Sequence, residues 1–238
     1  MKEIIKNILK KFDYRLVKIS KNKSSFDILL DLSNKYNIET VLDVGANTGQ
    51  FANTLRKNGY KNKIISFEPN SKIYDHLLKN SQRDKNWQIF KQCALGDFDG
   101  KIDLNISSYS PSTSILNFTN AHKMAKPEAK MVDTEKVNIF KLDSLSEELN
   151  LQNDNLLLKI DTQGYESNII KGANEILNKI KILFCEISFI ELYENQELWV
   201  DIIKLINSKG FYICSIENGF FDKESNELLQ ADIIFIKK

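Results

Sequence analysis

The sequence predicts an α/β fold built around a mostly parallel β-sheet, with an antiparallel pair of strands at one edge. The main observation is that short apolar runs alternate with amphipathic stretches of helical length from Thr40 onward. Strands separated by helices of this length form βαβ units, in which right-handed crossovers join parallel strands. The second observation is that two strand-like runs close the chain with only a short polar connection between them. A short connection of this kind favours antiparallel pairing.

The N-terminal residues precede this alternation, and we expect them to form a helical extension. Residues 2–18 have lysines on one side and, on the other, apolar side chains at helical spacing, namely Ile5, Ile8, Leu9, Phe12 and Leu16. Such a helix either packs on the domain with a solvated lysine face or makes peripheral contact with an anionic membrane surface. A second helix is expected over about 25–36. The predicted division is an extension over 1–38 and an α/β domain over 39–238.

The first half of the domain is predicted to contain three strands and two helices. The segment "TVLDVG" is a strand, residues 49–59 form a helix that closes on Gly59, and "KIISFEP" is a strand stopped by Pro69. A helix over 71–81 follows. The segment "WQIFKQCALG" is predicted to be the third strand.

The second half contains an unusual polar segment. After the short strand "KIDLNIS", residues from Ser107 to about Lys136 are rich in Ser, Thr and Asn and include Pro111 and Pro127. A loop this long is uncommon inside a compact domain unless it is functional or disordered. Folding resumes with "VNIFKLDSL", the buried strand "NLLLKID", a helix over about 166–178, the strand "KILFCEIS" and a helix over about 195–209. The runs "GFYICSIE" and "ADIIFIKK" form the closing antiparallel pair.

Size and composition exclude several classes of protein. A chain of 238 residues is long enough for one large α/β domain, and a net charge of +1 provides no global field toward nucleic acid. The odd set of Cys93, Cys185 and Cys214 lies in apolar runs, which predicts buried free thiols in a reducing compartment. No apolar run approaches 18 residues, so we expect a cytoplasmic protein without stable membrane insertion.

The stretch "VLDVGANTGQ", residues 41–50, predicts a ligand-binding turn. Gly45 and Gly49 follow Asp43 at the end of the first strand, and glycine permits positive φ and close approach of another molecule. Ligands of open α/β sheets lie beyond the carboxyl ends of the strands. The turn lacks the Lys-Ser or Lys-Thr of a P-loop and the third glycine of the dinucleotide fingerprint. The ligand therefore need not carry a phosphate.

Two acidic residues narrow the choice of ligand. Glu68 ends the second strand, where a carboxylate can accept hydrogen bonds from ribose hydroxyls, although this position alone does not distinguish adenosine ligands from one another. Asp43 would oppose a pyrophosphate and suit the sulfonium and ammonium groups of S-adenosylmethionine. The alternative is that Asp43 accepts hydrogen bonds within the turn and that Glu68 is a solvated strand end.

Six motifs in order resemble those of FkbM-type class I methyltransferases: "VLDVGANTGQF", "ISFEP", "ALGD", "SSYSPSTSIL", "LLKIDTQGYESNIIKGA" and "CEISFIELYE". The resemblance covers roughly residues 40–237. It implies a doubly wound, Rossmann-like sheet of seven strands with an antiparallel last hairpin. It also implies S-adenosylmethionine as methyl donor and a hydroxyl acceptor, plausibly on a sugar of a surface glycan or glycolipid, or on a secondary metabolite.

The resemblance also implies the residues of the donor site. Those expected to hold the methionine part or to border it are Asp43, Gly45, Ala46, Asn47, Gly49, Gln50 and Asp161. Those expected at the ribose and the adenine are Glu68, Pro69, Asn70, Ala94 and Leu95.

The stretch "LLLKIDTQGYE" supplies the catalytic candidates. Lys159 and Asp161 interrupt an apolar strand on the same side, and buried charges must be paired. Lys159 could pair with Glu186 at the end of the neighbouring strand, while Asp161 could lie beside the methyl group. Methyl transfer depends on holding the acceptor oxygen and the methyl carbon in line, and a hydroxyl acceptor must also lose a proton to a base. The candidate bases are Asp161, Glu186 and His122.

The polar segment is expected to bind the acceptor. Candidate acceptor-binding residues are Ser108, Ser112, Ser114, Gln163 and Tyr193, and the alternative for the serine-rich stretch is a mobile surface loop. An acidic pair with a loop histidine could also bind a divalent ion. The chain has only two histidines and no closely spaced ligand motif, however, so no metal site is predicted.

Two rival functions share parts of this pattern. A nicotinamide-dependent oxidoreductase would use the same strand, turn and Glu68, but the missing third glycine and Asp43 disfavour it. A non-catalytic binding module of the same fold would be expected to show a damaged turn, and this turn is intact. Nucleic acid as the acceptor lacks support because Lys123, Lys126 and Lys130 are interspersed with acidic residues. A small or glycan-linked hydroxyl acceptor is favoured.

Overall fold

The computed structural model describes residues 23–151 and 155–237, so the helix predicted over 2–18 lies outside the described residues. Its main sheet has seven strands in the order β3-β2-β1-β7-β8-β10-β9. Strands β3 to β8 of this order run parallel, and β10 runs antiparallel to both β8 and β9. These strands are β1 (Thr40–Val44), β2 (Lys63–Phe67), β3 (Trp87–Ile89), β7 (Leu156–Ile160), β8 (Ile180–Ser188), β9 (Phe211–Asn218) and β10 (Gln230–Lys237). The predicted fold class is confirmed.

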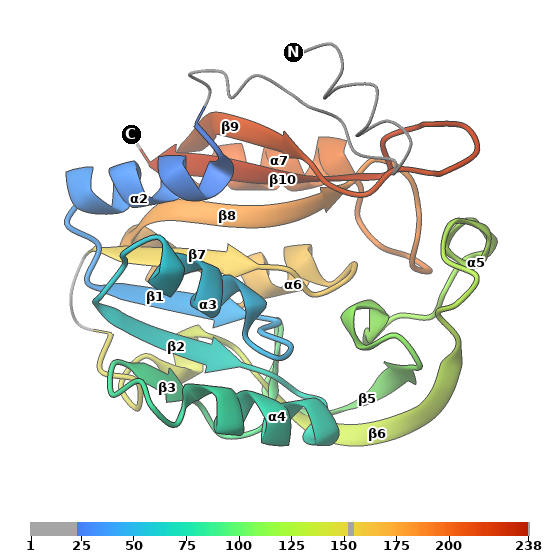
Figure 1. Cartoon of the computed structure of the whole chain (residues 1–238), viewed down its shortest axis with the longest axis horizontal. Helices are drawn as coiled ribbons and strands as arrows, with labels where there is room; N and C mark the ends of the chain where they lie inside the picture. Colours follow the sequence, from blue (N-terminus) through green and yellow to red (C-terminus); the bar gives the residue numbers. More distant parts are fainter. Residues whose placement is uncertain (1–22, 152–154, 238) are drawn as a thin grey trace, which may run out of the picture.

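Helices cover both faces of the sheet (Figure 1). On one face lie α2 (Ser25–Lys35), α3 (Gln50–Lys57) and α4 (Ser71–Ser81), and on the other lie α6 (Glu166–Lys171) and α7 (Trp199–Ser208). Each face has its own buried apolar cluster. Helix α2 buries Leu29 and Leu32 in the same cluster as α3 and the sheet. The division of the chain at residue 38 stays a prediction.

A second, three-stranded sheet of order β4-β6-β5 lies at the carboxyl end of the parallel strands. It consists of β4 (Ala94–Leu95), β5 (Gly100–Ser107) and β6 (Met131–Phe140). The single strand predicted for "WQIFKQCALG" is therefore wrong, because β3 and β4 belong to different sheets. Phe90 and Cys93, between the two strands, are buried in the core cluster, and burying both side chains turns the segment inward.

The long loop predicted over 107–136 is also wrong in part. It contains a short 3-10 turn at Ser110–Ser112, helix α5 (Asn120–Ala125) and the first half of β6. Most of residues 131–136 are exposed, so backbone pairing with β5, such as Ile106 with Asp133, holds this part of the strand. A strand without a buried face has no apolar alternation to reveal it.

The structure differs from the sequence prediction in three smaller respects. The helix predicted over 166–178 ends at Lys171 and is followed by a 3-10 turn at Ile176–Asn178, while the one predicted from about 195 begins at Trp199. Cys93 and Cys185 are buried as expected, but Cys214 is exposed because β9 is the edge strand. Within the described ranges, none of the helices has the length and apolar character needed to cross a membrane.

Candidate active site

A cavity of about 390 Å³ opens where the strand order reverses between β1 and β7, the position at which open α/β sheets bind ligands. Its walls come from the turn after β1, the ends of β2 and β7, strand β4, and the segment around the 3-10 turn after β5. The predicted residues that line it are Gly45, Ala46, Asn47, Gln50, Glu68, Pro69, Ala94, Leu95, Ser114, Lys159, Asp161 and Gln163. The structure thus brings together residues that lie more than a hundred positions apart.

The turn after β1 is shaped by close packing within the protein. Gly45 has φ +73°, and a Cβ atom there would lie 1.9 Å from the carbonyl oxygen of Asp161. Gly49 has φ +91° and leads into α3, and a Cβ there would lie 2.4 Å from the Trp87 ring. Both positions therefore need glycine even without a ligand. Gly45 still lines the cavity, whereas Gly49 faces Trp87 and Leu77 and is absent from the cavity wall.

Asp43 is fully buried, with 0% exposure, and does not line the cavity. Ser66 Oγ donates to its Oδ2 over 3.0 Å, and Lys159 Nζ lies 3.2 Å from its Oδ1. We expected Asp43 to contact the donor directly, but its position does not favour this contact. Asp43 instead compensates the charge of Lys159.

Lys159 ties the ends of β1 and β7 together. Its Nζ donates to the carbonyl oxygens of Val44 over 3.2 Å and of Gly45 over 2.8 Å, and it lies 3.6 Å from Asp161 Oδ2. Burial opposes its charged form, but the carboxylates of Asp43 and Asp161 outweigh burial and raise its pKa. The predicted pair with Glu186 is wrong because Asp43, not Glu186, is the register partner of Lys159.

Glu68 closes β2 and faces the cavity while only 6% exposed. Its two oxygens accept from the backbone N–H of Asn47 over 2.8 Å and of Asn70 over 2.9 Å. Burial raises the pKa of Glu68 to about 7, against the effect of these two hydrogen bonds. Asn70 itself caps α4 with its side chain and does not line the cavity. Glu68 thus presents a buried carboxylate to the ligand.

The wall beyond Glu68 is apolar and suits a flat ring. It is formed by the expected Ala94 and Leu95 together with Phe67, Cys93 and Leu104. Burial raises the pKa of the Cys93 thiol to about 12, so the thiol stays protonated and acts as a small apolar side chain.

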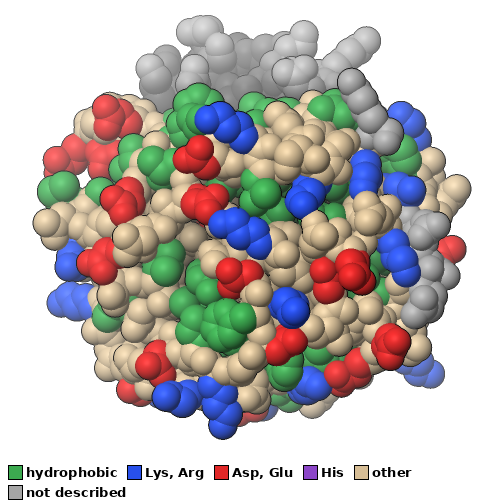
Figure 2. All heavy atoms as spheres, turned by 180° about the vertical axis from the view of Figure 1, so that it is seen from behind, with side chains coloured by type: hydrophobic (Ala, Val, Ile, Leu, Met, Phe, Trp, Pro, Cys, Tyr) green, Lys and Arg blue, Asp and Glu red, His purple; other side chains and the backbone are tan. Residues whose placement is uncertain are grey.

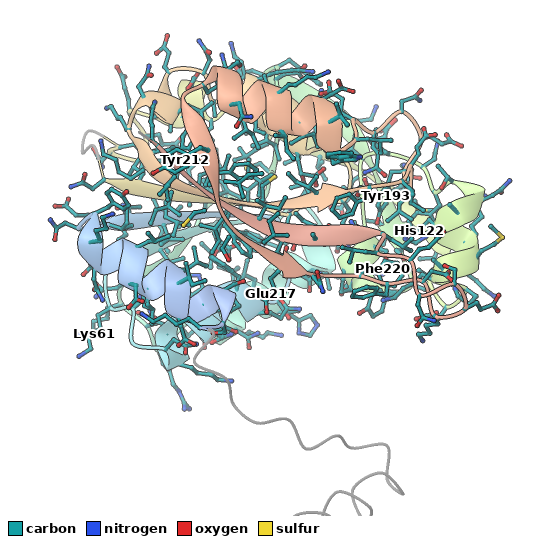
Figure 3. The ribbon with its side chains drawn as sticks, turned by 90° about the horizontal axis from the view of Figure 1, so that it is seen from above. Lys61, His122, Tyr193, Tyr212, Glu217 and Phe220 are labelled. Carbon is teal, nitrogen blue, oxygen red and sulfur yellow. The ribbon has the colours of Figure 1, made fainter. Side chains whose placement is uncertain are left out.

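Gln163 links the catalytic candidates. Asp161 follows β7 and has 38% of its side chain exposed. Gln163 Nε2 donates to Asp161 Oδ1 over 2.9 Å and to Glu186 Oε2 over 2.8 Å. Its Oε1 accepts from Tyr193 Oη over 2.7 Å. His122 Nε2 lies 3.5 Å from the same Tyr193 Oη, and Figure 3 shows the two side chains next to each other.

Glu186, Tyr193 and His122 stand behind Gln163 and do not line the cavity. Burial raises the pKa of Glu186 well above its usual range, and the nearby carboxylates of Asp161 and Asp232 add to the effect. His122 is 3% exposed and stacks on Phe118 at 3.8 Å between ring centroids. This buried position behind the cavity wall disfavours a direct catalytic role for His122.

The candidate serines divide into three positions. Ser114 lines the cavity and donates to the backbone oxygen of Gln163 over 2.7 Å. Ser112 is buried and hydrogen-bonds Tyr193 behind the wall. Ser108 is exposed and bridges Glu128 and Lys130. Only Ser114 is positioned to contact an acceptor.

His122 makes a testable contribution to stability. Burial lowers its pKa to about 4, below the unfolded value of 6.5, so the unfolded chain binds more protons between these values and stability falls as pH drops from 6.5 to 4. We expect His122→Phe, which keeps the stack on Phe118, to remove about 1–3 kcal/mol of this loss. Urea unfolding at pH 7 and pH 4.5 checks it. Equal pH dependence in both proteins would contradict the assignment.

Asp232 on β10 is the acidic residue of the cavity wall that sequence reasoning missed. The only local signal was a carboxylate inside the apolar run "ADIIFIKK". In the described part of the chain, no group of three or more His, Cys, Asp or Glu side chains is arranged to hold a metal ion. The absence of a required metal stays a prediction.

The model of the FkbM methyltransferase domain matches residues 43–213. The chain belongs to the FkbM methyltransferase family. This FkbM methyltransferase is 27% identical over 162 residues to the 2-O-methyltransferase NoeI of Sinorhizobium fredii, a match that covers 66% of each chain. It is 26% identical over 187 residues to the hexuronic acid methyltransferase AglP of Haloferax volcanii, covering 76% of this chain and 72% of that relative.

Family membership confirms the resemblance found in the sequence and the assignment of the chain as an S-adenosylmethionine-dependent methyltransferase. Among solved structures, a 1,6-didemethyltoxoflavin-N1-methyltransferase from Burkholderia thailandensis is similar at a TM-score of 0.47 and 8% identity. That likeness covers 88% of this chain and 76% of the other.

Proposed function

We propose that this FkbM methyltransferase transfers the methyl group of S-adenosylmethionine to a hydroxyl oxygen of a sugar, carried by a glycan, a glycolipid or a secondary metabolite. The observation that carries the proposal is that one cavity joins an apolar wall and the buried carboxylate of Glu68 to the carboxylates of Asp161 and Asp232. The names of the relatives NoeI and AglP support a sugar as acceptor.

The residues of the first half fit the donor. The wall of Cys93, Ala94 and Leu95 would hold the adenine, and Glu68 would accept from the ribose hydroxyls. The fit to a cation rests on charge: Glu68 and Asp161 face the cavity, and the nearby Lys159 is occupied by Asp43 and two carbonyl oxygens. A sulfonium and an ammonium would supply the missing positive charge.

The donor supplies an activated methyl group, and the protein supplies position. Lys159 fixes the backbone of Val44 and Gly45 against the end of β7, so the turn that would hold the methionine part is rigid. Gln163 holds Asp161 through a hydrogen bond and is itself fixed by Tyr193. Holding an acceptor oxygen in line with the methyl carbon can account for much of the rate enhancement.

The charge distribution on the surface does not favour nucleic acid as the acceptor. Figure 2 shows basic and acidic side chains interspersed over the rear face. In the polar segment, Lys126 lies over the rings of Tyr109 and Phe220. Both observations agree with a net charge of +1.

Calorimetric titration tests the proposal. We expect S-adenosylmethionine and its demethylated product to bind at micromolar concentration and a nicotinamide dinucleotide not to bind. Incubation with radiolabelled donor and a panel of free and lipid-linked sugars should then transfer label to a hydroxyl oxygen. Preferential binding of the dinucleotide would support the oxidoreductase instead. Donor binding without transfer to any hydroxyl in the panel would support a non-catalytic module.

A further inference from the structure

Four carboxylates lie side by side on one face of the sheet, near the carboxyl end of β7. Asp161 follows Ile160, which pairs with Cys185, so Asp161 lies beside Glu186. Glu186 pairs with Asp232, and Asp232 pairs with Glu217 on the edge strand. Like charges directly opposite one another destabilise a sheet. Lys159 lies near one end of this row, at Asp161, and is shared with Asp43. The cavity shows which members of the row face a ligand.

The cavity singles out Asp161 and Asp232, because the other two carboxylates do not line it. Asp161 is already engaged by Gln163 and lies near Lys159. Asp232 is half-buried, and no residue of 23–151 or 155–237 hydrogen-bonds its carboxylate. A half-buried carboxylate of this kind has its accepting positions open toward the cavity, where a ligand hydroxyl can use them.

The surroundings of Asp232 suit a sugar ring. Phe184 lies on β8 two residues before Glu186, the register partner of Asp232. Phe184 contacts Phe51, which contacts Phe26. These three rings line the cavity together with the polar groups of Gln50 and Thr54. Apolar ring faces flanked by hydrogen-bonding side chains match the alternating surfaces of a sugar. Gly45 and Asp161 line the same cavity.

The electrostatics of Asp232 suit a base at neutral pH. Burial, together with the carboxylates of Asp161 and Glu217, raises the pKa of Asp232 to about 7, while Lys159 acts in the opposite direction. Glu186, directly opposite on β8, is the remaining titratable neighbour. A catalytic base functions best with a pKa near the working pH.

We propose that Asp232 is a catalytic residue that contacts the acceptor and takes the proton of its hydroxyl during methyl transfer, and that the acceptor is an uncharged sugar. The oxygen forms its bond to the methyl carbon while the carbon–sulfur bond breaks and its electron pair stays on sulfur. The hydroxyl proton passes to the Asp232 carboxylate and later to water. This inference rests on the proposed function.

The acceptor class follows from the same charges. Asp161 and Asp232 both face the cavity, while Lys159, the one basic residue of its wall among the described residues, is paired with Asp43. A uronate would add a further carboxylate beside Asp161 and Asp232, with no cationic side chain of the wall free to pair it, and a desolvated like charge is strongly disfavoured. The acceptor should therefore differ from the one named for AglP.

The test compares Asp232→Asn with Glu217→Gln, which alters the same row outside the cavity. With saturating donor, we expect Asp232→Asn to lower kcat by roughly 10²- to 10⁴-fold, while calorimetry shows donor affinity within about threefold of wild type. Glu217→Gln should change kcat less than about threefold. In wild type, kcat/KM for the acceptor should rise with pH through about 7, and this rise should disappear in Asp232→Asn.

Several outcomes separate this inference from the proposed function. Wild-type protein that does not bind the donor would overturn both. Donor binding and transfer with full activity in Asp232→Asn would overturn the role of Asp232 alone, as would an unchanged pH profile. If Asp232→Asn does not fold, Asp232→Ser replaces it with the same criteria. Faster methylation of glucuronate than of glucose would overturn the acceptor class.

Discussion

Replacement of Glu68 by alanine is expected to weaken the binding of S-adenosylmethionine by about 100-fold or more. Glu68 is a buried carboxylate at the end of β2 that faces the cavity, and both of its oxygens already accept backbone hydrogen bonds. A hydrogen bond to a charged group contributes about 1.5–3 kcal/mol. Two ribose hydroxyls would then account for about 3–6 kcal/mol, or a factor of about 10² to 10⁴ in Kd. Calorimetry with the donor measures it.

Glu135→Ala is the matched control for this change. Glu135 accepts from the backbone N–H and hydroxyl of Ser71 at the start of α4, close to Glu68 in the fold, but it does not line the cavity. We expect its donor affinity to stay within about threefold of wild type. A Glu68→Ala protein that melts cooperatively and binds the donor as wild type does would show that the ribose lies elsewhere.

The parallel core could be predicted from the sequence because each of its strands is encoded locally. Strands β1, β2 and β7 are short runs buried along most of their length, and α4 begins at Ser71, directly after its capping residue Asn70. The second sheet could not be predicted in the same way. The first half of β6 is exposed and depends on pairing with β5, about thirty residues earlier. Such pairing leaves no local pattern in the sequence.

The site shows the same division between local and spatial information. Residues that directly follow the ends of parallel strands, Glu68 after β2 and Asp161 after β7, were predicted from their position alone and do line the cavity. Asp232 was missed because its place depends on the strand order, in which β10 inserts between β8 and β9. Asp43 was predicted to contact the donor because it ends a strand beside the glycine turn. Its burial beside Lys159 follows from the register between β1 and β7, which cannot be predicted from local sequence.

The different positions of Asp43 and Asp232 explain why one carboxylate should support the fold and the other should oppose it. Asp43 has a cation and a hydroxyl as partners, whereas Asp232 faces other carboxylates. A raised carboxyl pKa means that the folded chain holds a proton that the unfolded chain has released. The contribution of Asp232 to the stability of the folded protein therefore falls as pH rises from about 4 to about 7. Removing the charge of Asp232 should not harm the fold at pH 8.

Replacement of Asp43 by alanine, in contrast, is expected to lower the free energy of unfolding by about 3–5 kcal/mol. The change leaves Lys159 buried without its closest carboxylate partner, since Asp161 Oδ2 is farther away at 3.6 Å. It also removes the acceptor of the Ser66 hydroxyl. Urea unfolding at pH 7.5 measures the loss. Donor affinity should fall as well, because Lys159 also holds the backbone of Gly45, whose turn lines the cavity.

The double variant Asp43→Ala/Lys159→Met tests whether Asp43 stabilises the fold by compensating the charge of Lys159. Replacing a buried ion pair by apolar side chains is often neutral for stability, so the double variant should recover most of the stability that Asp43→Ala loses. Donor affinity should not recover, because methionine cannot donate to the carbonyl oxygens of Val44 and Gly45. If Asp43→Ala lost donor affinity while its stability fell by less than about 1 kcal/mol, Asp43 would have to contact the donor directly. Its burial behind the turn and its pairing with Lys159 argue against that result.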